Sequence, residues 1–277
     1  MDVLVSITTF VNSLMNALFR PLTGMIAAIP GWLSNMILSA VVGILAIVLF
    51  KYTSNQDAIG RVRDNIKAQM LGVKLFKDSM KVTLKLQGRM FKGALLLMFH
   101  SLRPMLVMII PFSLVVAQMA LWYQARPLVP GEQTVLTVKV DPAEINNIKL
   151  QTLTGARVTA GPVTAIDKNE INYQLQAAEN GTHRIVFQVG DETFTKQLVI
   201  GEGFTRLSPV RPGREIAKML MYPDEEPFTA DSPVKSISLE YPDRISLTSG
   251  TDWWIAYFFI ISLIAALIIK PFLKVKI

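Results

Sequence analysis

The chain of 277 residues contains no cysteine and only two histidines, His100 and His183. The first absence excludes disulfide bonds, a thiol nucleophile and cysteine-ligated metals. The second argues against a multi-histidine metal site or a histidine proton relay. Charged residues are also scarce, at 18% of the chain against about 25% in ordinary soluble proteins, while 51% of residues are apolar. Together with a mean hydropathy of +0.39, this composition indicates a membrane protein.

Sequence motifs of catalysis are missing as well. There is no Gly-x-Ser-x-Gly motif, no phosphate-binding loop and no zinc-ligand spacing. We therefore expect no enzymatic activity, no cofactor and no metal. The run Asp224-Glu225-Glu226 could bind a cation, but an exposed acidic loop is the simpler interpretation, and His183 is expected on the surface of a strand.

Three stretches are long and apolar enough to cross a bilayer, which takes roughly 20 mostly apolar residues, and their only charges are Lys51 and Lys270 at the ends of the first and third. They cover residues 31–51, 104–123 and 253–270. Tryptophan lies at an end of each stretch, where amphipathic rings favour the membrane interface. Pro111, inside the second stretch, is tolerable because neighbouring membrane helices satisfy the freed backbone groups. We predict three transmembrane helices.

Residues 1–30 show a different pattern. One helical stripe is apolar and the opposite face carries hydroxyls and amides, with almost no charge. This predicts an interfacial amphipathic helix, followed by a break at Pro21 and at Pro30-Gly31. The alternative is a cleaved signal peptide, but its basic first region is missing because Asp2 is the only early charge. The stripe consists of Val3, Leu4, Ile7, Phe10, Val11, Leu14, Met15 and Leu18.

The net charge of +7 is distributed unevenly. Residues 51–103 carry a net +8, residues 124–252 a net −4, and Lys270, Lys274 and Lys276 a further +3. Because lysine and arginine mark the cytoplasmic ends of membrane spans, residues 52–103 and the tail 271–277 are predicted to be cytoplasmic. The N-terminus and residues 124–252 then lie outside, an alternation that three spans satisfy.

The segment 52–103 combines a heptad pattern with many cations. Its ends must reach the same membrane face, whereas one straight helix of this length would extend about 70 Å, so a helical hairpin is required. We expect its turn near Gly72, Asp78-Ser79 or Gly88. The predicted seam contains Ile59, Val62, Ile66, Gln69, Val73, Phe76, Met80, Thr83, Gln87 and Met90, and the basic residues are Arg61, Arg63, Lys67, Lys74, Lys77, Lys81, Lys85, Arg89 and Lys92.

Two interpretations of these cations stay open. They can form a solvated face attracted to anionic lipid headgroups, or a dock for ribosomal RNA or another polyanion. Aromatic residues for base stacking are nearly absent from the segment, so no specific nucleic-acid sequence is expected to be read.

Residues 124–252 change to short alternating runs separated by turn signals. The dipeptide Asn180-Gly181 is the strongest hairpin signal in the chain. Seven short strands predict an antiparallel β-sandwich, with residues 203–235 as a long loop that holds one helical turn around 215–221. The expected strands cover residues 134–140, 148–153, 157–160, 171–177, 184–189, 194–200 and 236–241.

Taken together, these sequence patterns predict a membrane α-helical fold. It has three transmembrane helices with a cytoplasmic helical hairpin, and an inserted extracytoplasmic antiparallel β-sandwich. This layout resembles the YidC-like membrane insertase superfamily, in particular its small three-span archaeal and eukaryotic-type members with a cytoplasmic coiled coil. The resemblance is carried by the sequence from Lys51 to Gln56 (KYTSNQ) after the first span, and by Arg103-Pro104-Met105 before a proline-interrupted second span. It covers residues 1–123 and, by topology, 253–270.

The resemblance implies a non-enzymatic function, the insertion of hydrophobic segments into the bilayer through a half-open polar groove. Two features depart from the family: the basic groove residue typical of its bacterial members has no counterpart within a span, and the external β-domain follows the second span instead of preceding the core. The polar residues available for a groove can equally be helix-packing groups. They are Asn35, Ser39, Ser113, Gln118 and Ser262.

The implied partners are the lipid bilayer, nascent membrane proteins and the ribosome, with a homo-oligomer or other membrane subunits as further candidates. A bacterial or archaeal cytoplasmic membrane is the expected location. The alternative function is a membrane-anchored scaffold or binding protein that presents the β-sandwich outside and oligomerises through its coiled coil.

Overall fold

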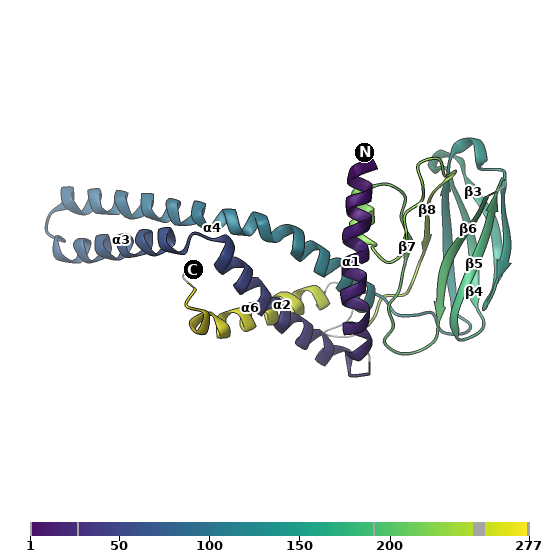
Figure 1. The fold of residues 1–277 in the computed structure, drawn as a ribbon, viewed down its shortest axis with the longest axis horizontal. Coiled ribbons are helices and arrows are strands. Elements are labelled where there is room, and N and C mark those ends of the chain that lie inside the picture. Colours follow the sequence, from purple (N-terminus) through teal and green to yellow (C-terminus); the bar gives the residue numbers. More distant parts are fainter. Residues whose placement is uncertain (1, 27, 191, 246–252, 276–277) are drawn as a thin grey trace. The chain divides into compact units, whose positions relative to one another are not determined.

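The computed structural model describes residues 2–26, 28–190, 192–245 and 253–275. Asp191, between the strands expected at 184–189 and 194–200, and Lys276 of the basic tail lie outside the described residues. The chain forms two compact units, which are described separately below. The first unit contains Met1–Asn35 and Leu114–Ala256, and the second contains Met36–Ser113 and Tyr257–Ile277. Figure 1 shows the elements of both.

Among the described residues, four helices are long and apolar enough to cross a membrane, which confirms the expectation of membrane-spanning segments in its general form. Three of them contain the predicted spans: α2 (Gly31–Thr53), α4 (Met80–Tyr123) and α6 (Trp253–Leu273). The fourth is α1 (Asp2–Ile26), predicted as an interfacial helix.

The predicted break at Pro21 is wrong, because α1 continues through it. A proline removes one backbone donor from a helix. Phe19 and Thr23 on either side are buried, so packing on both sides outweighs that lost bond.

In the second unit, α3 (Gln56–Leu75) and the first part of α4 run antiparallel and form a helical hairpin. The connection lies at residues 76–79, one of the three predicted positions, where the Thr83 hydroxyl donates to the Phe76 carbonyl at 3.1 Å. A Cβ atom added at Gly93 of α4 would lie 2.7 Å from the Ile66 side chain of α3, and one added at Gly72 of α3 would lie 3.0 Å from the Leu86 side chain of α4. These two close contacts define the register of α3 against α4.

The hairpin seam agrees with the heptad prediction throughout α3 and in part of α4. From Ile59 to Val73 the predicted positions are buried or half-buried, and so are Thr83 and Met90 of α4. The prediction is wrong at Phe76 and Met80 beside the turn, which are exposed, and at Gln87, which is exposed while its neighbour Leu86 is half-buried. Past the hairpin, α4 continues without interruption through Pro104 and Pro111 for a total of 44 residues.

The β-domain of the first unit contains two antiparallel sheets. The larger has the order β3-β4-β1-β8-β7, and the smaller has the order β2-β5-β6. The strands are β1 (Gln133–Val140), β2 (Ile148–Leu153), β3 (Ala156–Ala165), β4 (Glu170–Ala177), β5 (Gly181–Val189), β6 (Glu192–Ile200), β7 (Val210–Arg211) and β8 (Val234–Leu239).

Both sheets contribute to one apolar core. Residues alternate between buried and partly exposed along β1 and β4, as expected when one face of a sheet is covered. Leu136, Leu175 and Ile237 of the larger sheet join Phe187 and Leu198 of the smaller in a single cluster of buried residues.

Two sequence expectations for this domain are corrected. Asn180-Gly181 does not close a hairpin, because β4 pairs with β1 and β3 whereas β5 pairs with β2 and β6. The turn therefore passes the chain from one sheet to the other. The strand expected over residues 157–160 does not end there either, since β3 continues through Gly161-Pro162 to Ala165 with shifts in register.

Candidate functional site

Two of the predicted groove residues, Ser39 and Ser262 of the second unit, lie at a close contact between α2 and α6. Ser39 is fully buried and Ser262 is 6% exposed. A Cβ atom at Gly43, one turn after Ser39, would lie 2.1 Å from the Ser262 backbone carbonyl oxygen, so the helix backbones nearly touch. The Ser262 hydroxyl donates to the Phe259 carbonyl at 3.0 Å within its own helix. Small residues that let two helices approach closely are typical of membrane helix pairs.

The other three predicted groove residues have different surroundings. Ser113, in the second unit, is exposed on α4. Asn35 and Gln118, in the first unit, are fully buried, and Gln118 Nε2 donates to Asn16 Oδ1 at 2.8 Å. The assignment of all five to one polar groove stays a prediction.

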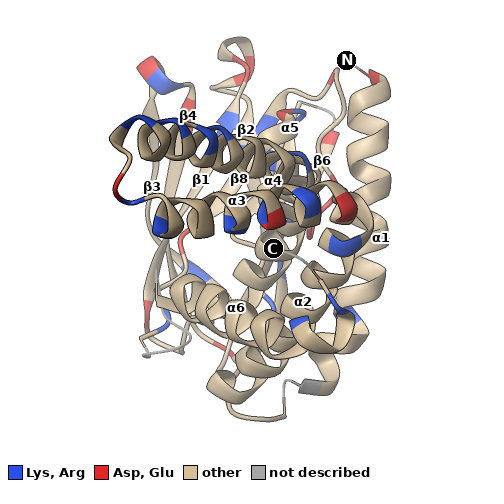
Figure 2. Cartoon of the chain, turned by 90° about the vertical axis from the view of Figure 1, so that its left-hand side faces the viewer, with Lys and Arg blue, Asp and Glu red and all other residues tan. Residues whose placement is uncertain are grey.

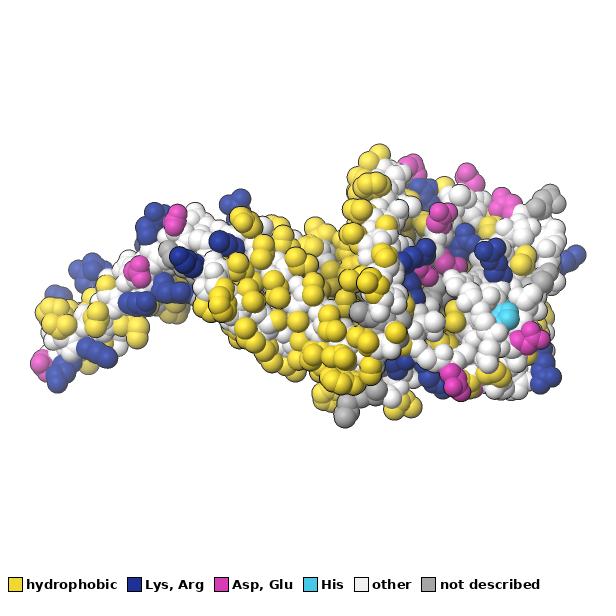
Figure 3. Space-filling view, turned by 60° about the horizontal axis from the view of Figure 1, so that its bottom comes forward, with side chains coloured by type: hydrophobic (Ala, Val, Ile, Leu, Met, Phe, Trp, Pro, Cys, Tyr) yellow, Lys and Arg dark blue, Asp and Glu magenta, His cyan; other side chains and the backbone are white. Residues whose placement is uncertain are grey.

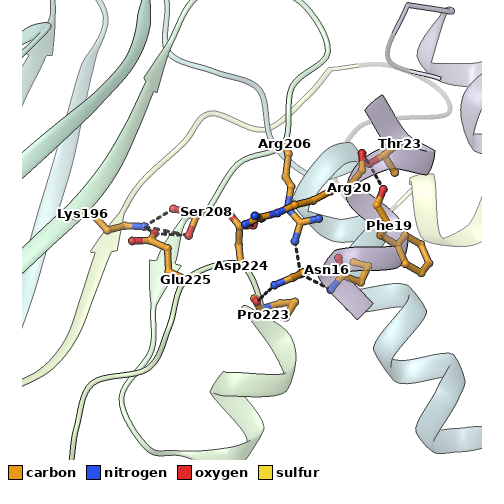
Figure 4. Close-up of polar contacts among 11 residues, drawn as sticks. Asn16, Phe19, Arg20, Thr23, Lys196, Arg206, Ser208, Pro223, Asp224 and Glu225 are labelled. Atoms are coloured by element: carbon orange, nitrogen blue, oxygen red, sulfur yellow. Dashed lines mark hydrogen bonds and ion pairs between the residues drawn. The ribbon is translucent and has the colours of Figure 1, made fainter. Parts of the chain in front are cut away.

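A partly buried polar network, absent from the sequence prediction, joins α1 to the β-domain (Figure 4). At its centre Asn16 Oδ1 accepts from Gln118 and from Arg206 Nη2, the latter at 2.6 Å, while Asn16 Nδ2 donates to the Pro223 carbonyl at 2.7 Å. Arg206 Nε in turn donates to Asp224 Oδ1 at 2.7 Å. Burial lowers the pKa of Arg206, and the charge of Asp224 opposes that shift.

Contacts of this kind extend along almost the whole of α1. Asp2 pairs with Arg214 near its start, Asn12 Nδ2 donates to the Met219 carbonyl at 2.7 Å, and Arg20 pairs with Asp224 at 3.2 Å. Met219 belongs to the short helix α5 (Ile216–Met221), which packs on α1. The polar face of α1 is therefore covered by the segment that follows β6.

The apolar face of α1 points away from the domain (Figure 3). Its exposed fractions reach 69% at Phe10 and 80% at Met25. In water this arrangement would be unfavourable, because each large apolar side chain gains about 1.5–3 kcal/mol on full burial. The outward face suits contact with lipid. Val11 and Met15 of the predicted stripe are half-buried, and the exposed stripe extends further along the helix than predicted. The exposed residues of this apolar stripe are Val3, Leu4, Ile7, Phe10, Leu14, Leu18, Leu22 and Met25.

A second buried ion pair fastens the same segment to the smaller sheet. Lys196 of β6 is completely buried and pairs with Glu225, and its ammonium donates to the Ser208 carbonyl at 2.5 Å. Burial lowers the pKa of Lys196, and the opposing effect of Glu225 is smaller. Although Ser208 Oγ lies 3.2 Å from Lys196 Nζ, this hydroxyl is itself buried and hydrogen-bonds Glu225, which suits a structural role better than that of a nucleophile.

The ends of the three predicted spans meet in the first unit. The Ser34 and Tyr123 hydroxyls, near the start of α2 and at the end of α4, lie 2.9 Å apart. Tyr123 stacks on Trp254 of α6 with ring centroids 6.2 Å apart, and Phe204 packs on Tyr123 at 5.1 Å. Of the aromatic residues at the span ends, Tyr123 and Trp254 thus belong to a buried cluster, whereas Trp32 and Trp253 are 51% and 66% exposed.

The predicted basic residues of the hairpin are accessible. Eight of the nine are exposed and Arg63 is half-buried; Figure 2 shows the cations along α3 and α4. Within the ranges that the structure describes, none of the nine forms an ion pair with a carboxylate. Because these charges are uncompensated, the hairpin presents a positive surface.

Some of the missed residues carried a signal in the sequence. Lys196 falls on the inward phase of β6, between Phe194 and Leu198, so strand alternation alone places it in the core. Asn12 and Asn16 are one turn apart on the polar face of α1, but their partners lie between 102 and 207 residues away in the sequence. The expectation that the acidic run is an exposed loop is wrong for two of its members, since the side chains of Asp224 and Glu225 are only 9% and 15% exposed.

No protein-family model, curated protein or solved structure matches this chain. Among the described residues, no group of three or more histidines, aspartates and glutamates is placed to hold a metal ion.

Proposed function

We propose that this protein is a YidC-like, insertase-like integral membrane protein that assists hydrophobic segments into the bilayer without enzymatic chemistry. In this proposal α2, α4 and α6 span the membrane, α1 lies on its outer surface and the β-domain is an extracytoplasmic sandwich. The hairpin and the C-terminus are cytoplasmic, in a bacterial or archaeal membrane. Nascent membrane proteins and the ribosome are the proposed partners of the hairpin.

Two observations support three spans in place of four. The polar face of α1 contacts charged residues of the β-domain from Asp2 to Arg20, and hydrocarbon offers no stabilisation to such groups. A helix attached to a polar domain along its length suits the membrane surface better than the interior. The contact of Ser34, Tyr123 and Trp254 also favours placing the start of α2, the end of α4 and the start of α6 on one membrane side.

The observation that carries the proposed function is the continuity of α4. One helix of 44 residues contains an arm of the basic hairpin and the apolar segment that ends at Tyr123. A cationic arm that leads directly into a membrane helix is suited to receive a chain at the cytoplasmic surface and to bring it to the bilayer.

The second candidate is a membrane-anchored scaffold or binding protein that oligomerises through the hairpin. It is favoured by the burial of four of the five polar residues and by the tight contact of Gly43 with Ser262. Both features are those of helix packing.

Site-specific photocrosslinking separates the two candidates. A photoreactive residue is placed at Ser113, which is exposed on α4, and at Lys81 in the hairpin, with buried Ser262 as the matched control. An insertase should yield adducts with ribosome-bound nascent membrane segments from the first two positions and none from the third. Adducts of Lys81 with a second copy of the chain, and of Ser113 with lipid alone, would support the scaffold.

The orientation is tested by labelling single cysteines, because the native chain contributes no thiol background. Met80 is 87% exposed in the hairpin and Ile166 is 77% exposed in the β-domain. A membrane-impermeant maleimide applied to intact cells should label a cysteine at 166 and not one at 80. The reverse pattern would contradict the proposed topology.

A further inference from the structure

A pocket of about 440 Å³ opens in the first unit beside the aromatic cluster of the helix ends. It is lined by four segments: residues 29–31 at the start of α2, 126–129 after α4, 201–204 after β6, and Arg244 before α6. The lining is apolar at Pro30, Pro127 and Phe204 and charged at three positions. A lining of this composition fits an amphiphilic ligand.

The two arginines of the pocket differ in their partners. Arg126 forms a bidentate ion pair with Glu132, with N–O distances of 2.7 and 2.9 Å, so its charge is already compensated. Arg244 has no carboxylate partner among the residues that the structure describes. Its guanidinium donates to the Ala125 carbonyl at 3.1 Å and lies 4.8 Å from the centre of the Phe204 ring, while its buried Nε has no hydrogen-bond acceptor.

This arrangement holds a cation in place without a counter-charge. Burial and the neighbouring charge of Arg126 both lower the pKa of Arg244. A phosphate oxygen is a suitable ligand for such a group, since guanidinium binds phosphate through charge-assisted hydrogen bonds. The start of α2 also lines the pocket, and the positive end of its dipole favours an anion in the same place.

The third charged residue points to the rest of the ligand. Glu202 is exposed, lines the same pocket and forms no ion pair within the described part of the chain. Arg244 and Glu202 therefore present one uncompensated charge of each sign. A zwitterion matches this pair better than a simple anion does, because each charge of the ligand then meets its opposite.

We propose that this pocket binds the phosphoethanolamine headgroup of a phospholipid, with the phosphate on Arg244 and the ammonium on Glu202. The apolar lining then receives the glycerol backbone and the first acyl carbons. This inference does not depend on insertase activity, because it rests on the pocket and its charges alone.

The test uses the full-length protein in detergent and native mass spectrometry with dioleoylphosphatidylethanolamine, dioleoylphosphatidylglycerol and dioleoylglycerol as probes. Phosphatidylethanolamine should bind best and dioleoylglycerol at least tenfold more weakly, a difference of about 1.4 kcal/mol or more. Glycerophosphoethanolamine and inorganic phosphate are added as competitors. Displacement of the lipid by either at an equal concentration would overturn the lipid as the source of the headgroup.

Three variants make the test specific. Arg244→Gln should reduce phosphatidylethanolamine binding at least tenfold, while Arg157→Gln, the matched loss of an exposed arginine on β3, should leave it unchanged. Glu202→Gln removes an exposed side chain with little risk to folding, and should abolish the preference for phosphatidylethanolamine over phosphatidylglycerol. An unchanged preference in Glu202→Gln, or equal binding of dioleoylglycerol by the native protein, would refute the proposal.

Discussion

The contact between α2 and α6 predicts that a glycine-to-alanine substitution in a helix, at Gly43, destabilises the protein. Replacing a helical glycine by alanine normally stabilises a protein by about 0.5–1 kcal/mol, because glycine loses more backbone entropy on folding. At Gly43 the new Cβ atom would lie 2.1 Å from the Ser262 carbonyl oxygen. Non-bonded heavy atoms rest roughly 3.5 Å apart, so the two helices would have to separate by about 1 Å or more.

The size of the effect follows from two opposing contributions. Excess volume in a packed contact costs about 1–3 kcal/mol, and the gain in helix propensity offsets up to about 1 kcal/mol of it. Gly43→Ala should therefore lower the free energy of unfolding by about 1–2 kcal/mol. Gly88→Ala is the matched control, since Gly88 is exposed on α4 and a Cβ atom there would meet nothing within 4 Å. This substitution should raise the free energy of unfolding by about 0.5–1 kcal/mol.

Unfolding of the full-length protein by dodecyl sulfate in mixed micelles, followed by tryptophan fluorescence, measures both variants. The reasoning requires the two substitutions to move the unfolding midpoint in opposite directions. If Gly43→Ala were as stable as Gly88→Ala, the close approach of α2 and α6 at this point would be refuted.

Further predictions concern the ion pairs and the hairpin. Glu225→Gln removes the counter-charge of Lys196 and should lower the free energy of unfolding by about 3–5 kcal/mol. In a double-mutant cycle, adding Lys196→Met should restore most of that loss, because no unpaired charge then remains buried. The Arg126 guanidinium lowers the pKa of Glu132 from its ordinary value of 4.5. The ion pair therefore stabilises the folded protein fully above that ordinary pKa, and this stabilisation is lost as the pH falls through the folded-state pKa of Glu132. Glu132→Gln should accordingly flatten the acid limb of the stability curve, and an unchanged limb would contradict this assignment. Cysteines introduced at Ile66 and Gly93 should join on oxidation, and a failure to do so would refute the hairpin register.

Features that depend on local pattern could be predicted from the sequence. The three apolar stretches coincide with α2, α6 and the second part of α4, because hydropathy over about 20 residues is a property of the segment itself. Seven of the eight strands in the described part of the chain were expected, since alternation of apolar and polar residues is equally local. Strand pairing was not predictable in this way: Asn180-Gly181 has the composition of a hairpin turn, but a turn does not determine which strand its neighbour will join.

The network around Asn16 shows a second limit of sequence reasoning. Its members come from α1, α4 and the segment after β6, and no periodicity connects Asn16 with Arg206. Charge was misleading here, because Asp224 and Glu225 were expected in water and are mostly buried beside cations. A buried charge is stable only when paired, so the composition of a loop cannot indicate its burial until its partners are known.

The outward apolar stripe of α1 has a consequence for any fragment of this protein. Since α1 is fastened to the β-domain by the Arg20–Asp224 and Asp2–Arg214 pairs as well as by Asn12 and Asn16, it need not depend on α2 for its attachment. A protease that separated this domain from its membrane helices would then produce a fragment in which α1 still exposes Phe10, Leu14 and Leu18. Such a fragment would bind again to the lipid surface or to a second copy of itself. Proteolysis should therefore let the domain diffuse apart from the membrane helices without releasing it from the membrane.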